Sequence, residues 1–415
     1  MTPPSVRSAT RRFVALTALR WLPVGLTIPV MVLLASSRGL TLIQIALVSI
    51  VHSVTVACLE LPTGGLADAV GRRPVLVASG LLHLGSCAAF VAADGVAGFA
   101  FAMALMAVGR ALDSGPLEAW YVDTVHGCDP RADVVPGLSR AGIADCLALS
   151  AGAVTGGLLP ALLEGGASSL LVLPFVAAAL LDLVSIIAVL VLVTPTGPAR
   201  TGSALQSVRR GLAAVPATVT ASVALSVRDG ALRTVLLLSA VCGLCLGTLE
   251  LLGPGLFADL AGSRTGGSAV FGLVMAASFL AGAAGAALAP TARRLTRGSL
   301  AWAVTGLTAL SGMAVAGVAA GDTVLLAAAA YCCFYLANAA AWPLLHAVLH
   351  ARVGADRRAS VLSASSLALM LGGATSSLIN PRLVEAGGRP AAYLLVGAAT
   401  VGAGLLALRL RSGYE

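Results

Sequence analysis

Long apolar runs separated by short polar breaks follow one another along almost the whole chain. Each run has roughly the 20 residues that an α-helix needs to cross the hydrocarbon core of a bilayer. The pattern therefore predicts twelve membrane-spanning helices. They lie near residues 13–36, 41–62, 75–93, 97–123, 139–163, 169–194, 233–257, 268–290, 299–320, 322–350, 360–384 and 390–410.

The composition agrees with a membrane protein and excludes most soluble classes. Of 415 residues, 58% are hydrophobic and only 11% are charged, and the mean hydropathy is +0.96. A soluble domain has about 25% charged residues, so this chain has too few to cover a surface that faces water. We predict an all-α membrane protein. A soluble enzyme and a secreted disulfide scaffold are both excluded.

The basic residues predict the orientation of the chain in the membrane. All 26 are arginines; with the N-terminus placed inside, 20 of them fall in inside segments and four in outside loops. The positive-inside rule then places both termini in the cytoplasm of a multi-pass protein of the plasma (cytoplasmic) membrane. Because the arginines recur between the spans and form no single patch, nucleic acid is not an expected partner.

The longest break divides the chain into two halves. We predict a six-helix bundle over residues 1–194, a cytoplasmic linker over 195–232 and a second six-helix bundle over 233–415. Within the linker, SALQSVRRGLAAV has the spacing of a short surface helix, although a solvated linker explains it as well. A weak repeat at an offset of 226 residues places IALV (45–48) on FGLV (271–274). Two related halves of this kind typify transporters that work by alternating access, and a monomer suffices for that mechanism.

The break after the second span carries the sequence GGLADAVGRR, residues 64–73. It resembles the loop signature of the major facilitator superfamily, and the matching positions are Gly64, Asp68, Gly71, Arg72 and Arg73. The resemblance implies the fold of that superfamily, with twelve helices in two pseudo-symmetric bundles. It also implies a gating latch, in which the motif pairs with Asp123 and docks near residues 359–360. Exposed loop charges that only set topology are the alternative.

The fifth span contains GAVTGG at residues 152–157, which is similar to the antiporter motif of the same superfamily. Gly152, Gly156 and Gly157 match, whereas Ala153 stands where that motif has proline. The resemblance implies export by exchange. Small residues at this spacing also let two helices pack closely without any further role.

Charges inside the spans are candidates for proton coupling, because each costs at least about 2.5–3.5 kcal/mol at the bilayer centre. Arg110 lies near the middle of span 4, and Asp113, three residues on, shares its helix face. We expect these two to pair, and Asp113 to take up a proton when Arg110 moves to another partner. A static pair is the alternative. We expect Arg20 and Asp145 to form a structural ion pair, with Glu118 competing for Arg20.

Span 10 carries an aromatic and polar stripe that is a candidate substrate wall. Its members, at steps of 4, 3 and 4 residues, are Tyr331, Tyr335, Asn338 and Trp342. This spacing keeps them on one side of a helix. The superfamily resemblance implies that spans 1, 4, 7 and 10 line the cavity, so Glu250 on span 7 would face it too. Plain packing explains the stripe equally well.

No other sequence pattern indicates a bound metal or cofactor. The CGLC at 242–245 lies within a span and has no second ligand pair, so we expect no metal. A phosphate-binding loop is impossible without lysine, and we expect no cofactor. We predict a proton-coupled antiporter that exports small amphiphilic compounds. The alternatives are a proton symporter or facilitator that imports a nutrient, and a membrane sensor that transports nothing.

Overall fold

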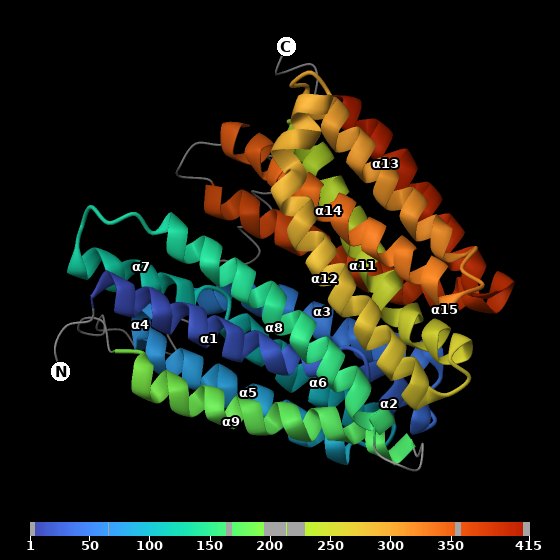
Figure 1. Ribbon diagram of the computed structural model, residues 1–415, viewed down its shortest axis with the longest axis horizontal. Helices are drawn as coiled ribbons and strands as arrows, with labels where there is room; N and C mark the ends of the chain where they lie inside the picture. Colours follow the sequence, from blue (N-terminus) through green and yellow to red (C-terminus); the bar gives the residue numbers. More distant parts are fainter. Residues whose placement is uncertain are drawn as a thin grey trace.

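The structure is a computed structural model that describes residues 5–64, 66–162, 168–194, 213, 229–352 and 358–409. Two groups of helices make up the molecule, and Figure 1 shows them meeting at one end and diverging toward the two termini. Most of the predicted linker, including all but one residue of its predicted surface helix, lies outside the described residues.

The first bundle holds the helices before the linker, and each predicted span of this half is present. Two spans are divided in two, because α1 is followed by the short α2 and α6 is followed by α7. The elements are α1 (Val6–Thr27), α2 (Met31–Ser37), α3 (Leu42–Gly64), α4 (Leu66–Val70), α5 (Arg72–Ala92), α6 (Gly95–Leu112), α7 (Pro116–Cys128), α8 (Val135–Leu162), the 3₁₀ turn η1 (Ser168–Val172) and α9 (Leu173–Leu192).

The second bundle holds α11 (Gly230–Leu260), α12 (Arg264–Leu295), α13 (Leu300–Val318), α14 (Val324–Arg352) and α15 (Arg358–Leu406). The last of these is two helices, because Gly387 and Gly388 have non-helical backbone angles. A straight helix of 49 residues would be about 74 Å long, far more than a bilayer accommodates. Among the described residues, eleven segments are long and apolar enough to span a membrane, and dividing α15 gives twelve. The predicted all-α fold is therefore confirmed.

Three clusters of buried side chains explain the divergence in Figure 1. The largest is shared by both bundles: Leu34 of α2 and Phe99 of α6 belong to it together with Phe257 of α11 and Phe271 of α12. The other two clusters each belong to a single bundle. One contains Phe13 and Trp120, and the other contains Val235 and Val304. The bundles thus share a core at the end far from the termini and have separate cores at the near end.

Glycines bring the helices of the two bundles into close contact. On α8, a side chain at Gly156 would overlap the backbone of Leu26 in α1, and one at Gly157 would overlap the backbone of α12 at Ser268. The Ser268 hydroxyl donates a hydrogen bond to the Gly157 carbonyl at 3.0 Å. The glycines of the predicted antiporter motif therefore have a packing role within and between the bundles.

Where the bundles share a core, two arginines bind groups at the C-terminal ends of helices. Arg38 donates hydrogen bonds to the carbonyls of Phe90 and Val91 at the end of α5, at 3.1 and 2.7 Å. In the second bundle, Arg389 forms an ion pair with Asp259 near the end of α11. Cations at helix C-termini satisfy free carbonyls and complement the helix dipole.

Candidate transport site

The fourth span is broken where its charged residues lie, so the prediction of one continuous helix over 97–123 is wrong. Helix α6 ends at Leu112 and α7 begins at Pro116, with Asp113 in the capping position. Gly115 has φ = 105°, a conformation that favours glycine, and proline is well suited to the first position of a helix. Irregular backbone inside a membrane is tolerated where it is buried in protein or lines a wet cavity.

Hydroxyl groups satisfy the backbone at this break. The Ala111 carbonyl near the end of α6 accepts hydrogen bonds from the Thr63 hydroxyl of α3 at 2.8 Å and from the Ser114 hydroxyl at 2.9 Å. The end of α6 is therefore fixed against α3. This fixes the position of Asp113, which is the next but one residue.

Asp113 forms an ion pair with Arg20 of α1. Its side chain is 7% exposed, whereas that of Arg20 is 26% exposed. The sequence predicted Arg110 for Asp113 and Asp145 for Arg20, and both pairings are wrong. The physical reason is tertiary packing: α1 packs against α7 and α8 and brings Arg20 to Asp113, a contact that spacing within one helix does not report.

Two guanidinium groups lie against the ring of Trp21. The Arg20 guanidinium is 5.1 Å from the ring centre and that of Arg110 is 5.6 Å from it. Within about 6 Å, a cation is attracted to the face of an indole ring. The ring thus holds two cations near each other, which would otherwise repel.

A cavity of about 100 Å³, which we call the central pocket, lies at this arrangement. Residues of both bundles line it: Arg20, Trp21, Val56, Arg110, Ala111 and Ser114 come from the first, and Ser366 and Met370 of α15 come from the second. Among the described residues, its lining holds two cations and no acid. The walls therefore favour a small polar or anionic group.

Two further acids act on these cations from nearby. Asp145 of α8, like Asp113, lies within electrostatic range of Arg20 and Arg110. The buried Asp145 Oδ1 has no hydrogen-bond partner among the described residues. Glu250 of α11 has an exposed side chain in the middle of a long apolar helix and is attracted by Arg110 of the opposite bundle. We infer that Glu250 faces the space between the bundles.

Glu118, the third predicted coupling residue, lies in the first turn of α7 and is exposed. An acid at this position complements the positive end of the helix dipole. Arg20 pairs with Asp113 and not with Glu118. The predicted competition for Arg20 is thus absent from this structure.

The predicted wall on α14 divides into a packed part and an accessible part. Tyr331 is fully buried, and its hydroxyl donates a hydrogen bond of 2.9 Å to the Leu249 carbonyl. Its ring contacts Phe257 and Phe271, so this residue belongs to the shared core and not to a binding wall. The expectation of a binding role for Tyr331 is corrected on that ground.

The rest of the stripe remains partly exposed. Tyr335 lies within electrostatic range of Glu250, and Asn338 lies within reach of the Cys242 thiol of α11. One turn further, Trp342 contacts His346 with ring centres 4.8 Å apart. Tyr335 and Asn338 thus face α11, the helix that carries Glu250. Their role in substrate binding stays a prediction.

The signature loop has the local structure that its residues require. Gly71 has φ = 100° and precedes α5, so a residue with a side chain would be strained there. Arg72 forms the predicted ion pair with Asp123 of α7 at 2.5 Å, and Arg73 donates a hydrogen bond to the Leu190 carbonyl in α9. Both contacts lie within the first bundle. The Asp68 side chain and the predicted docking near residues 359–360 lie outside what the structure describes.

Sequence reasoning missed Trp21, Ser114 and Ser366 as pocket residues. Trp21 carried a usable signal, because it is one of four tryptophans and follows an arginine inside a span. The two serines carried none, since small hydroxyl residues are common in membrane helices and only the fold brings these two together.

The fold and this site define a class of protein: a secondary transporter with two six-helix bundles and a charged pocket between them. The family model of the Major Facilitator Superfamily matches residues 13–377. The chain therefore belongs to the major facilitator superfamily and is a transporter, not an enzyme. No match to a curated protein was found for the sequence.

Solved structures with the same fold transport different compounds. The nucleoside transporter NupG has a TM-score of 0.74 and 13% identity, over 98% of this chain and 100% of its own. The peptide transporter POT in complex with sulfate has a TM-score of 0.72 and 16% identity, over 97% of this chain and 94% of its own. The human organic anion transporter MFSD10 (TETRAN) has a TM-score of 0.66 and 16% identity, over 97% of this chain and 100% of its own. Each likeness establishes the fold alone.

Proposed function

We propose that this transporter is a proton-coupled antiporter that exports small amphiphilic compounds. The observation that carries the proposal is the Arg20–Asp113 ion pair at the edge of the central pocket. While Asp113 is charged, it neutralises Arg20. A proton on Asp113 removes that neutralisation and adds a positive charge to the pocket.

This change of charge gives the coupling a definite sign. A cationic compound is attracted by Glu250 and by the aromatic ring of Tyr335, and it is repelled when protonation of Asp113 leaves Arg20 uncompensated. The proton and the cation therefore compete. Competition for one transporter is what exchange requires, because each ligand has to leave before the other binds.

A second candidate function follows for the opposite substrate charge. An anion bound by Arg20 and Arg110 would displace Asp113 from Arg20, and the displaced Asp113 would then bind a proton more readily. The proton and the anion would bind together, and the protein would be a symporter. The observation that favours this candidate is the lining of the central pocket, whose described residues include Arg20 and Arg110 and no acid.

Transport by purified protein in liposomes separates the two candidates. Tetraphenylphosphonium would serve as the cationic probe and benzoate as the anionic one, with a pH gradient imposed in either direction. For the antiporter we expect tetraphenylphosphonium to accumulate in vesicles that are acidic inside, and this uptake to collapse with an uncoupler. Benzoate accumulation in vesicles that are acidic outside would overturn the antiporter in favour of the symporter.

Controls decide whether the uptake belongs to the protein. Liposomes without protein measure passive partitioning of each probe. Expression in a host that lacks its efflux pumps, with and without an uncoupler, tests export in cells. Protection against no toxic cation, together with growth on a poor nutrient, would favour import.

We also propose that the protein acts as a monomer in the plasma (cytoplasmic) membrane, with both termini in the cytoplasm. The distribution of arginines supports this orientation. Single cysteines added at each terminus of a variant without its eight native cysteines would test it. Labelling of intact cells by an impermeant maleimide would contradict it.

A further inference from the structure

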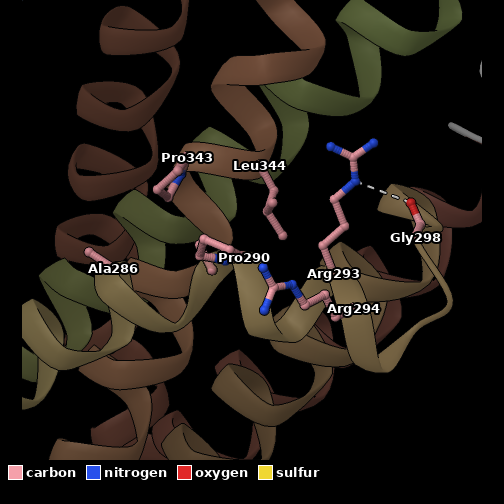
Figure 2. A pocket seen from close by; sticks show the side chains of 8 residues that line it. Ala286, Pro290, Arg293, Arg294, Gly298, Pro343 and Leu344 are labelled. Carbon is pink, nitrogen blue, oxygen red and sulfur yellow. Dashed lines mark hydrogen bonds between the residues drawn. The ribbon is translucent and has the colours of Figure 1, made fainter.

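A second cavity lies within the second bundle, at the end of the molecule where the two bundles have separate cores. It has a volume of about 750 Å³, within the range of roughly 300–1,000 Å³ that is typical of ligand pockets. Figure 2 shows its walls, which come from the end of α12 and from α14. We call it the α12–α14 pocket, and its lining residues are Ala286, Ala289, Pro290, Arg293, Arg294, Gly298, Pro343 and Leu344.

The local sequence explains why a hollow forms here. Directly before the pocket residue Ala286, a side chain at Gly285 would overlap the backbone of Leu336, so α12 and α14 are in close contact there. Each helix then has a proline at the pocket, Pro290 in α12 and Pro343 in α14. Proline breaks the hydrogen-bond ladder and bends a helix. The two helices thus separate toward the end that carries the termini.

The pocket is apolar along its walls and cationic at one end. In Figure 2, Ala286, Pro290 and Pro343 lie on one side, Arg293 reaches toward Gly298, and the Arg294 side chain extends from α12 toward Pro290. Arg293 donates a hydrogen bond of 3.2 Å to the Gly298 carbonyl, and both arginines are exposed. This arrangement suits a ligand with an apolar chain and an anionic head.

The charge of the two arginines is not balanced by their own helices. The sequence has no aspartate or glutamate anywhere in α12, α13 or α14. At the end of α12, the carbonyls of Ala292 and Arg293 accept hydrogen bonds from the Thr296 hydroxyl. An anionic ligand would therefore meet a local excess of positive charge.

We propose that the α12–α14 pocket binds an anionic phospholipid. Its acyl chain would lie against Ala286, Pro290 and Pro343, and its phosphate would contact Arg293 and Arg294. The pocket lies near the termini, which we place in the cytoplasm, and the cytoplasmic leaflet is the one that carries anionic lipids. The inference is independent of the substrate and of proton coupling.

Lipid binding to the purified protein tests the proposal directly. Native mass spectrometry would compare phosphatidylglycerol with phosphatidylcholine of the same acyl chains. We expect phosphatidylglycerol to be preferred, and the double variant Arg293→Gln/Arg294→Gln to lower that preference by about thirtyfold, as expected for two basic residues near the surface. Both arginines are exposed, so the variant should fold, which its thermal unfolding would verify.

Two more variants make the test specific. Arg131→Gln/Arg140→Gln removes two exposed arginines of the first bundle, outside the pocket, and should leave the preference unchanged. Ala286→Leu narrows the pocket and should weaken binding of both lipids. Equal binding of the two lipids by the unmodified protein would overturn the proposal. So would an equal loss in the Arg131/Arg140 variant, or full displacement of the lipid by inorganic phosphate, which would assign the pocket to a free anion.

Discussion

Arg20 of α1 forms an ion pair with Asp113, the residue at which α6 ends. The pair joins the first span to the break in the fourth span, so a change in the charge of Asp113 acts on two helices at once. A break without this acid would be only a packing irregularity. The acid makes it a site at which a proton is able to alter the contacts around the central pocket.

Asp113→Asn should abolish transport that is driven by a pH gradient. Asparagine keeps the shape of the side chain but neither carries a charge nor takes up a proton, so Arg20 stays uncompensated. We expect gradient-driven accumulation in liposomes to fall by about tenfold or more, equivalent to about 1.4 kcal/mol of lost coupling. Asp259→Asn is the matched control, because it breaks an ion pair at the far end of α11. Unchanged transport by Asp113→Asn would remove this residue from the mechanism.

Gly157→Ala should destabilise the conformation described here. The added methyl group would overlap the backbone of Ser268 in the other bundle, and overpacking of this kind costs about 1–3 kcal/mol. Gly142→Ala on the same helix is the control, because nothing lies within 4 Å of a side chain there. Thermal unfolding in detergent would compare the two. Equal melting temperatures would contradict the close contact between α8 and α12.

Tyr331 and Tyr335 should respond differently to substitution, although they are one turn apart. Tyr331→Ala removes a fully buried ring from the shared core and should lower the free energy of unfolding by about 3–5 kcal/mol. Tyr335→Ala should change the range of compounds transported while the protein stays folded, and Trp342→Ala should do the same. Unfolding measurements paired with a panel of substrates would check this. An unaltered range in both latter variants would assign the whole stripe to packing.

Reversing Asp123 to arginine should slow turnover more than it weakens substrate binding. The ion pair with Arg72 positions the signature loop against α7, and a like charge there would repel it. Combining Asp123→Arg with Arg72→Asp restores opposite charges and should recover part of the rate. Transport rate and substrate affinity, measured on the same preparation, test this prediction. An equal loss of rate and affinity would argue against a latch.

The number of spans and the class of fold were predictable from the sequence, because each span is a local property of about 20 residues. The Arg72–Asp123 contact was predictable too, through a motif of fixed spacing. The partners of Asp113 and Arg20 were not. Helical periodicity compares residues within one helix, whereas the Arg20–Asp113 pair joins two spans. The break after Asp113 did have a sequence signal, since glycine before proline is typical of a helix boundary.

The central pocket was less predictable than the charges around it. Arg20 and Arg110 are conspicuous inside apolar runs, and so is Glu250. Ser366 and Met370 are ordinary residues whose place in the pocket depends on how one bundle lies against the other. That relation is set by contacts between residues more than 100 positions apart, such as Gly157 and Ser268. The pattern of residues in a single sequence indicates local periodicity, and it does not predict contacts between residues so far apart in the chain.

The aromatic core that joins the bundles at one end also determines the free energy of the conformation that is open at that end. To open that end, the protein would have to expose rings such as Phe257 and Phe271 to water, at roughly 25 cal/mol for each Å² of apolar surface. The cores at the other end, which are now separate, would have to bury a comparable area when they meet. Binding of a proton and a small substrate supplies only a few kcal/mol. The two ligands would therefore switch the transporter between its two conformations only if the apolar area buried at one end is close to that buried at the other.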